Sequence, residues 1–285
     1  LRTAVTWPEA YTPSEDAPAN PFTIELPEAD RCPRYAGVLI EGVTVQPSPE
    51  WLQNRLKSIG LRPTNNIVAM TNYVLHALGH PLHAFDADQL RGQKIVVKTL
   101  PEDSTFTTLD GTERKLRAGK DLYICDAEGP VAIAGIMGGQ NSEVEDTTTN
   151  IFLESAYYAP SGIRNSASHL GLKTDASYRY ERGTDPNLPY KAALRALQLI
   201  QELAGGPTSQ ILDVQEKEFP PFPVSLDLKY AARLIGSDLG TDYIVGILEA
   251  LDIKVVDQND QQLELAVPPY RVDVTRPQDV LEEIL

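Results

Sequence analysis

The sequence has no run of 18 consecutive apolar residues, so it predicts no membrane-spanning helix and no membrane partner. Cysteine is scarce as well: Cys32 and Cys125 lie far apart, each among strand-like residues. Two distant thiols argue against a disulfide framework and indicate buried cysteines in a reducing compartment, so we expect a cytoplasmic protein. Internal repeats and low-complexity tracts are also absent, which excludes a repeat architecture.

Basic residues are few. The chain has 25 Lys and Arg against 40 Asp and Glu, a net charge of −15. Residues 208–285 carry a net charge of −9, whereas residues 31–207 are nearly balanced at −1. Because an acidic chain repels phosphate, we expect any nucleic-acid ligand to be held mainly by other domains. The start at Leu1 and an apparent helix running to Leu285 favour a fragment of a longer protein.

The chain has enough apolar residues, 42%, for more than one core. Residues 1–30 contain five prolines and are expected to be a linker or the tail of a preceding domain. Prolines at 220, 221 and 223 mark a second boundary. We expect an α+β protein: a mixed α/β domain with mostly antiparallel sheets over residues 31–207, then a small, mainly helical domain over residues 215–285.

Capping and turn residues locate the elements. Helices are expected at residues 49–59 with Ser48 as the N-cap, at 67–78 and at 188–203. Residues 34–45 and 94–139 have strand patterns, with hairpin turns at 110–111 and 128–129. Beyond the second boundary we expect helices at 226–235 and 241–251, a hairpin at 254–267, and a last helix whose capping box joins Thr275 and Gln278.

Three histidines, His76, His80 and His83, lie within eight residues and raise the question of zinc. The glutamate of a zincin helix is missing and Pro81 breaks the helical register, so we favour a helix end and a buried, hydrogen-bonded His83. Gly138 and Gly139 form another candidate site. No Lys-Ser/Thr follows them, so close backbone approach is favoured over a phosphate loop.

Residues 150–183 hold the densest combination of apolar and polar side chains. An apolar run, Ile151–Leu153, leads to the carboxylate of Glu154, and a polar cluster begins at Thr174. Such an arrangement suits a pocket for a polar ligand. The alternative is an ordinary buried strand followed by a solvated, salt-bridged loop.

Six segments, in their order and spacing, resemble the beta subunit of bacterial phenylalanine–tRNA ligase. They are RYAGVLIEGVTV, MTNYVLHALGHPLHAFD, LDGTERKL, IAGIMGG, NIFLESAYYAP and GLKTDASYRYERGTDP. The resemblance covers residues 30–285, with residues 30–207 similar to the editing domain and 215–285 to the small helical domain after it. It implies hydrolysis of tyrosine wrongly esterified to the phenylalanine tRNA.

The resemblance also implies the site. Glu154 would accept the tyrosine hydroxyl, while Gly138 and Ala176 would leave room for the ring. His83 would hold the ester or the attacking water, with Asn72, Thr71 and Thr174 as polar support. A site that hydrogen-bonds this hydroxyl rejects phenylalanine, because phenylalanine would leave the acceptor of the site without a partner. No nucleophile elbow is present, so we expect direct attack by water.

For the parent enzyme, the resemblance implies ATP, the phenylalanine tRNA and a catalytic alpha subunit in a heterotetramer of two alpha and two beta chains. It also implies magnesium at an interface site. The metal positions are Asp273, Asp279, Glu282 and Glu283. Without the resemblance, these are solvated acids near a capped helix. A module that binds an amino acid or a partner without hydrolysis is the alternative function; a free-standing editing protein is disfavoured because a second domain follows.

Overall fold

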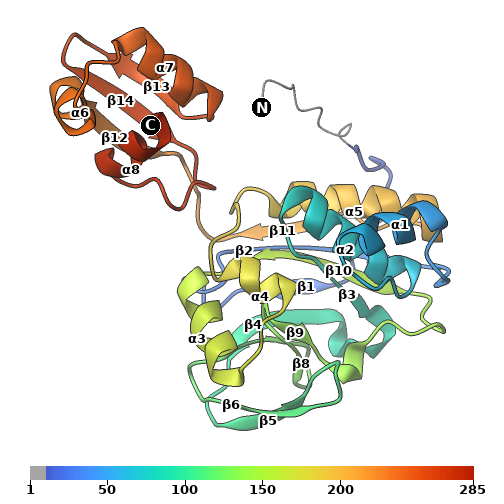
Figure 1. Ribbon diagram of the computed structural model, residues 1–285. Coiled ribbons are helices and arrows are strands. Elements are labelled where there is room, and N and C mark those ends of the chain that lie inside the picture. Colours follow the sequence, from blue (N-terminus) through green and yellow to red (C-terminus); the bar gives the residue numbers. More distant parts are fainter. Residues whose placement is uncertain (1–10) are drawn as a thin grey trace. The chain divides into compact units, whose positions relative to one another are not determined.

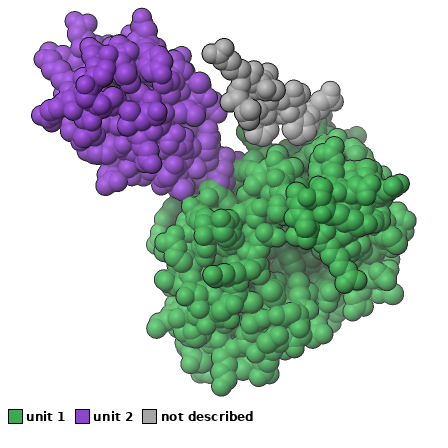
Figure 2. Space-filling view, viewed as in Figure 1, with its two compact units in different colours: residues 1–184, 188–217 green, residues 185–187, 218–285 purple. Residues whose placement is uncertain are grey.

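The computed structural model describes residues 11–285, which form two compact units (Figures 1 and 2). Unit 1 contains residues 11–184 and 188–217, and unit 2 contains residues 185–187 and 218–285. Residues 1–10 of the expected linker lie outside the described residues. The predicted fold class, a mixture of helices and mostly antiparallel sheets, is confirmed. In residues 11–285, no helix combines the length and the apolar character needed to cross a membrane.

A four-stranded antiparallel sheet lies at the centre of unit 1. Its order is β11 (Leu212–Gln215), β2 (Arg34–Ile40), β10 (Ile151–Tyr157) and β3 (His83–Asp86). Side chains alternate between the two faces of a strand. In β10, Ile151 and Leu153 belong to one core while Phe152 and Ala156 belong to the other. The sheet therefore separates two apolar layers.

Three helices cover the first face of this sheet (Figure 1): α1 (Glu50–Ser58), α2 (Asn66–Leu78) and α5 (Pro189–Ala204). They bury Leu52, Met70 and Leu197 completely. Helix α2 ends at Gly79, whose φ of 74° is the left-handed conformation that glycine adopts at low cost. The expected Ser48 cap of α1 is wrong: Pro49 is the N-cap, and no side chain caps this helix.

A five-stranded sheet packs toward the second face. Its order is β1 (Thr23–Glu25), β4 (Lys94–Thr99), β7 (Leu122–Cys125), β8 (Pro130–Ile133) and β9 (Met137–Gly138), with β1 parallel to β4. A separate hairpin joins β5 (Ser104–Thr107) and β6 (Glu113–Leu116). Short 3-10 helices lie at Ala87–Gln89, Arg91–Gln93 and Gln140–Ser142.

Two parts of unit 1 differ from the expectations. Strand β1 lies inside the expected linker, because Phe22 and Leu26 are buried and bring the intervening residues to β4. The segment after β10 forms two helices, α3 (Pro160–Leu170) and α4 (Asp175–Tyr180), where no helix was predicted and a solvated loop was the alternative. Glycine ends α3 at Gly171, with a φ of 63°.

Unit 2 is a three-stranded antiparallel sheet with three helices. The strand order is β12 (Phe222–Asp227), β14 (Gln262–Val267) and β13 (Lys254–Gln258). The helices are α6 (Leu228–Ile235), α7 (Thr241–Ala250) and α8 (Pro277–Ile284). Strand β12 was not predicted. The expected Thr275–Gln278 capping box is also wrong, because the Asp279 carboxylate accepts from the backbone N–H groups of Thr275 and Arg276.

Candidate functional site

Three neighbouring strands place Gly37, Glu154 and His83 directly opposite one another. Residues paired in this way project from the same face of a sheet. Since Phe152 and Ala156 alternate in step with Glu154 and pack in the core shared with the five-stranded sheet, Glu154 and His83 face that sheet. Glycine at position 37 leaves no side chain beside Glu154, and a Cβ there would come within 2.3 Å of the Phe152 ring.

A pocket lies over this row of residues. Its cavity volume is about 70 Å³, and it is partly open to solvent. Pocket walls come from β3, β7, β8, β9, β10 and α4, and most of them are apolar. The residues that line it are Pro81, Leu82, His83, Ile124, Ala132, Ile133, Gly135, Ile136, Met137, Gly138, Glu154, Ala176 and Tyr180. An apolar slot with few polar groups is typical of a small-molecule site.

Glu154 is the carboxylate of this pocket. Its side chain is 5% exposed, and Oε1 accepts a 2.6 Å hydrogen bond from the Tyr158 hydroxyl. Burial disfavours the ionised form and raises the pKa of Glu154 to about 7, while the bond from Tyr158 acts in the opposite direction. A buried acceptor of this kind stabilises a donor on a bound molecule, because an unpaired partner is costly.

His83 lies beside Glu154 on β3. Its Nε2 atom is buried and has no hydrogen-bond partner among residues 11–285, so the expectation of a fully hydrogen-bonded histidine is wrong at this nitrogen. Burial lowers the pKa of His83 to about 4, and the imidazole is therefore neutral near pH 7. Such a nitrogen can accept a hydrogen bond from a ligand or from a water molecule.

Gly138 lies against the ring of His83. A Cβ at this position would lie 2.6 Å from Cε1 and 2.7 Å from Nε2 of the imidazole, closer than carbon atoms approach in proteins. The predicted close approach of the glycine backbone to a neighbour is confirmed. Ala176, in the first turn of α4, also lines the pocket, and its side chain is a single methyl group.

Thr174 stands at the start of α4. Its hydroxyl accepts from the Ser177 N–H at 3.0 Å and donates to the Ile136 carbonyl oxygen at 2.9 Å. The first bond caps the helix, with Ser177 completing a capping box. The second fastens α4 to the chain between β8 and β9, so Thr174 positions two walls of the pocket.

Three predicted residues do not line the pocket: Thr71 and Asn72, which lie on α2, and Thr174, the N-cap of α4. The Thr71 hydroxyl donates to the carbonyl of Val68 in the preceding turn. Residues that the sequence reasoning missed include Tyr158, which binds Glu154, and Tyr180, which lines the pocket. The signal for Tyr158 was weak because it lies just beyond β10, where strand alternation no longer predicts direction.

The four predicted metal ligands belong to unit 2, and the carboxylates of three of them are paired with arginines. Arg271 contacts Asp273 at 3.0 Å and Glu283 at 2.6 Å, and Asp279 pairs with Arg276 at 2.9 Å. Glu282 is exposed. Within residues 11–285, no group of three or more His, Cys, Asp or Glu side chains is placed to hold a metal ion. As arranged here, the four acids do not fit a magnesium site.

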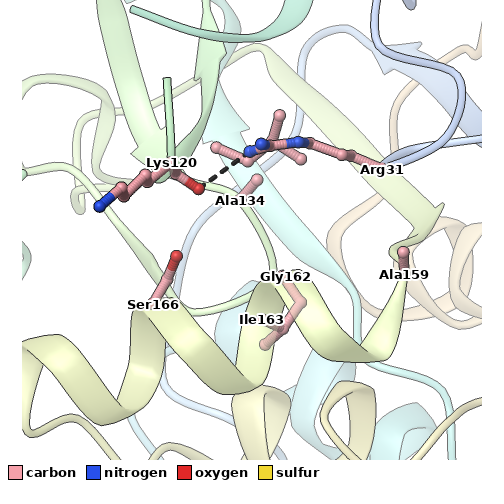
Figure 3. A pocket seen from close by; sticks show the side chains of 8 residues that line it. Arg31, Lys120, Ala134, Ala159, Gly162, Ile163 and Ser166 are labelled. Atoms are coloured by element: carbon pink, nitrogen blue, oxygen red, sulfur yellow. Dashed lines mark hydrogen bonds between the residues drawn. The ribbon is translucent and has the colours of Figure 1, made fainter. Parts of the chain in front are cut away.

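A second cavity of about 10 Å³ lies beside α3 (Figure 3). The Arg31 guanidinium spans it and donates to the Lys120 carbonyl oxygen at 2.9 Å. Ala134, Ile163 and Ser166 contribute other walls. None of the predicted site residues lines this cavity, and its size leaves room for little more than a water molecule.

Comparison with known proteins gives concordant matches. Residues 31–205 match the B3/4 domain, and residues 224–285 match the tRNA synthetase B5 domain. The chain is 50% identical over 264 residues to the phenylalanine–tRNA ligase beta subunit of Bacteroides fragilis, covering 92% of this chain and 32% of that protein. For the same subunit of Porphyromonas gingivalis, the identity is 46% over 279 residues, covering 98% and 34%.

A solved N-terminal fragment of the phenylalanyl-tRNA synthetase beta subunit from Pyrococcus horikoshii is 15% identical, with a TM-score of 0.45, and the match covers 97% of this chain and 77% of that one. The resemblance inferred from the sequence motifs is confirmed by the matches to the family models and the bacterial subunits. The chain spans about a third of the length of the curated relatives it matches.

Proposed function

The chain belongs to the B3/4 domain family, and on that premise we propose that it is part of a phenylalanine–tRNA ligase beta subunit whose pocket removes tyrosine wrongly esterified to the phenylalanine tRNA. The observation that carries this proposal is the buried carboxylate of Glu154 in a slot lined mostly by apolar residues. Tyrosine differs from phenylalanine by one hydroxyl, and Glu154 offers that hydroxyl an acceptor.

The discrimination follows from the cost of an unpaired polar group. A synthetic site shaped for phenylalanine rejects a molecule with an added hydroxyl only about 10²-fold. A second site that binds the hydroxyl discriminates in the opposite sense, because phenylalanine would leave Glu154 desolvated and without a ligand donor. The aromatic ring would occupy the slot between Ala176 and Gly138, whose small size keeps it open.

Hydrolysis requires a water molecule near the ester and stabilisation of the charge that develops on the carbonyl oxygen. Water oxygen bonds to the ester carbon, the bond from that carbon to the ribose oxygen breaks, and a proton passes from the water to the ribose oxygen. The neutral His83 imidazole, with its unpartnered Nε2, would orient the water or the ester. Thr174 would act indirectly, by holding α4 in place.

The remaining features of the parent enzyme are part of the same proposal. They comprise ATP-dependent aminoacylation, an alpha-subunit partner, a heterotetrameric assembly and a cytoplasmic location. Magnesium, when bound by the whole enzyme, would neutralise charge at the site of aminoacylation. Since the acids around α8 are partnered by arginines, no step of the hydrolysis is assigned to the metal.

The test is a deacylation assay with the phenylalanine tRNA carrying either tyrosine or phenylalanine. We expect the protein to release tyrosine and to leave the phenylalanine ester almost intact. Equal hydrolysis of the two esters, or none of either, would contradict the proposal. Spontaneous hydrolysis without protein is the control.

A binding module without hydrolytic activity is the second candidate. It is supported by the Thr174 hydroxyl, which already bonds two backbone groups, and by the absence of Thr71 and Asn72 from the pocket lining. Under this alternative the protein would bind free tyrosine in equilibrium dialysis, in preference to phenylalanine, and leave both esters intact.

A further inference from the structure

Tyr158 is the group that contacts Glu154 most directly. It follows the end of β10 and is 1% exposed, and its hydroxyl lies 2.6 Å from Oε1 of the carboxylate. Hydrogen bonds of this length from a hydroxyl to a carboxylate are among the strong ones in proteins. No other residue in the range 11–285 has a hydrogen bond to the Glu154 side chain.

Other titratable groups surround Glu154 without binding it. Tyr35 on β2 is fully buried, and its hydroxyl has no partner among the described residues. The Tyr180 hydroxyl, from α4, interacts with the carbonyls of Ala156 and Pro81. The Cys32 thiol faces the carbonyl of Arg34, and His83 is the neighbour on β3. Tyr158 is thus distinguished from its neighbours by one contact.

We infer that Tyr158 is a positioning residue for specificity: it holds one oxygen of Glu154 so that the other oxygen is left to accept the hydroxyl of the ligand. This inference rests on the proposed function. A carboxylate has two oxygens that both accept, and a bond to one of them restricts rotation of the group. An acceptor fixed before the ligand arrives loses less conformational freedom on binding than a mobile one.

The contact also influences ionisation. The bond from Tyr158 lowers the pKa of Glu154 and thereby opposes the effect of burial. Without it, burial acts alone, and a larger share of Glu154 is protonated near pH 7. Tyr35, Tyr180 and Cys32 have pKa values raised well above their usual range, and the pKa of His83 is about 4. They therefore keep one charge state near pH 7.

The closing experiment compares Tyr158→Phe with Tyr35→Phe, which removes a buried hydroxyl from the same cluster without breaking a hydrogen bond. The ratio of kcat/KM for the tyrosine and phenylalanine esters is measured between pH 6 and 9. In Tyr158→Phe we expect the ratio to fall about tenfold and its midpoint to move to higher pH. Tyr35→Phe is expected to match the wild-type protein in both readouts.

A Glu154→Ala variant in the same series distinguishes a failure of the role of Tyr158 from a failure of the proposed function. If this variant loses the preference for tyrosine while Tyr158→Phe keeps the wild-type ratio and midpoint, the role of Tyr158 is refuted and the proposed function stands. If Glu154→Ala also keeps the preference, the proposed function itself fails.

A second measurement covers the case in which Tyr158→Phe does not fold. Replacing Tyr158 by 3-fluorotyrosine keeps the shape of the side chain and makes its hydroxyl a stronger donor. The pH midpoint of the tyrosine preference is then expected to move to lower pH. A midpoint that stays in place, or moves upward, would overturn the inference.

Discussion

The carboxylate in the pocket of unit 1 and the carboxylates around α8 in unit 2 differ in burial and in partners. Glu154 is buried, has a tyrosine hydroxyl as its partner, and has a pKa raised to about 7. Asp279 and Asp273 have arginine partners, which lower their pKa values. Both regions contain acids with perturbed pKa values, but those of unit 2 are perturbed by arginine partners, whereas Glu154 is perturbed mainly by burial.

This difference shows why perturbed acids alone do not define a site. Ion pairs near a surface shift pKa values as a consequence of structure, whereas desolvation without a counter-ion leaves a group able to bind a ligand. The four predictions below test this contrast, beginning with the largest expected effect.

Filling the slot should have the largest effect. Ala176→Trp or Gly138→Trp should abolish release of tyrosine, because the new ring would occupy the space of the substrate ring. The fold should survive, since overpacking typically costs about 1–3 kcal/mol. The assay is deacylation of the tyrosine ester, with circular dichroism as the folding check. A folded tryptophan variant with the wild-type rate would place the active pocket elsewhere.

The second prediction concerns stability and pH. Glu154 has a folded pKa of about 7 against a reference of 4.5, so its contribution to stability is lost as pH rises from 4.5 to 7. His83, with a folded pKa of about 4 against 6.5, has the opposite sign: its contribution is lost as pH falls from 6.5 to 4. Between pH 4.5 and 6.5 the two slopes oppose each other.

Replacing either Glu154 or His83 should therefore reveal the pH dependence of stability that the other residue causes. In Glu154→Gln, the free energy of unfolding should fall by about 3 kcal/mol between pH 6.5 and 4, the equivalent of the His83 shift. In His83→Gln it should fall by a similar amount between pH 4.5 and 7. Urea unfolding at a series of pH values measures both. Profiles parallel to that of the wild type would show that these groups are not buried in the way described.

Part of this site could be predicted from the sequence, and part of it depends on long-range strand pairing. Alternation along β10 predicts that Glu154 and Phe152 share a face, but no local pattern reveals that β3 and β2 flank β10. The position of His83 beside Glu154 depends on that long-range pairing. Gly138 was recognised as a point of close approach, whereas its neighbour, the His83 ring, is 55 residues away in the chain.

The errors have physical causes as well. Helices α3 and α4 contain few large aliphatic side chains, so little in the sequence indicated them, and packing of Ile163 and Tyr180 in the core stabilises them. Ser48 precedes a proline and resembles a cap, yet the helix begins one residue later, and the buried Ser48 hydroxyl has no partner among the described residues. At α8, Asp279 competes successfully with Gln278 for the cap, because its carboxylate accepts strongly from backbone N–H groups.

The third prediction is the loss of specificity in Glu154→Ala. Removing the acceptor should reduce the difference between tyrosine and phenylalanine by about 1–3 kcal/mol, or roughly 5- to 150-fold in affinity. Calorimetric titration with the two free amino acids measures this difference. Asp273→Ala, which removes a carboxylate from unit 2, is the matched control and should change neither affinity. If the preference for tyrosine persists in Glu154→Ala, Glu154 is not the residue that distinguishes tyrosine from phenylalanine.

The smallest effect is expected from the acids around α8. Replacing Asp273, Asp279, Glu282 and Glu283 by Asn or Gln should leave tyrosine release within about twofold of the wild-type rate, because exposed ion pairs contribute about 0–1 kcal/mol each and none of these residues lines the pocket. Arg271 sharpens the test, since its guanidinium contacts both Asp273 and Glu283. Arg271→Ala would free two carboxylates whose mutual repulsion magnesium relieves, so magnesium affinity, measured by calorimetry, should rise while deacylation stays constant. A folded quadruple variant that no longer releases tyrosine would show that the acids of unit 2 take part in the hydrolysis, and the contrast between the two regions would be wrong.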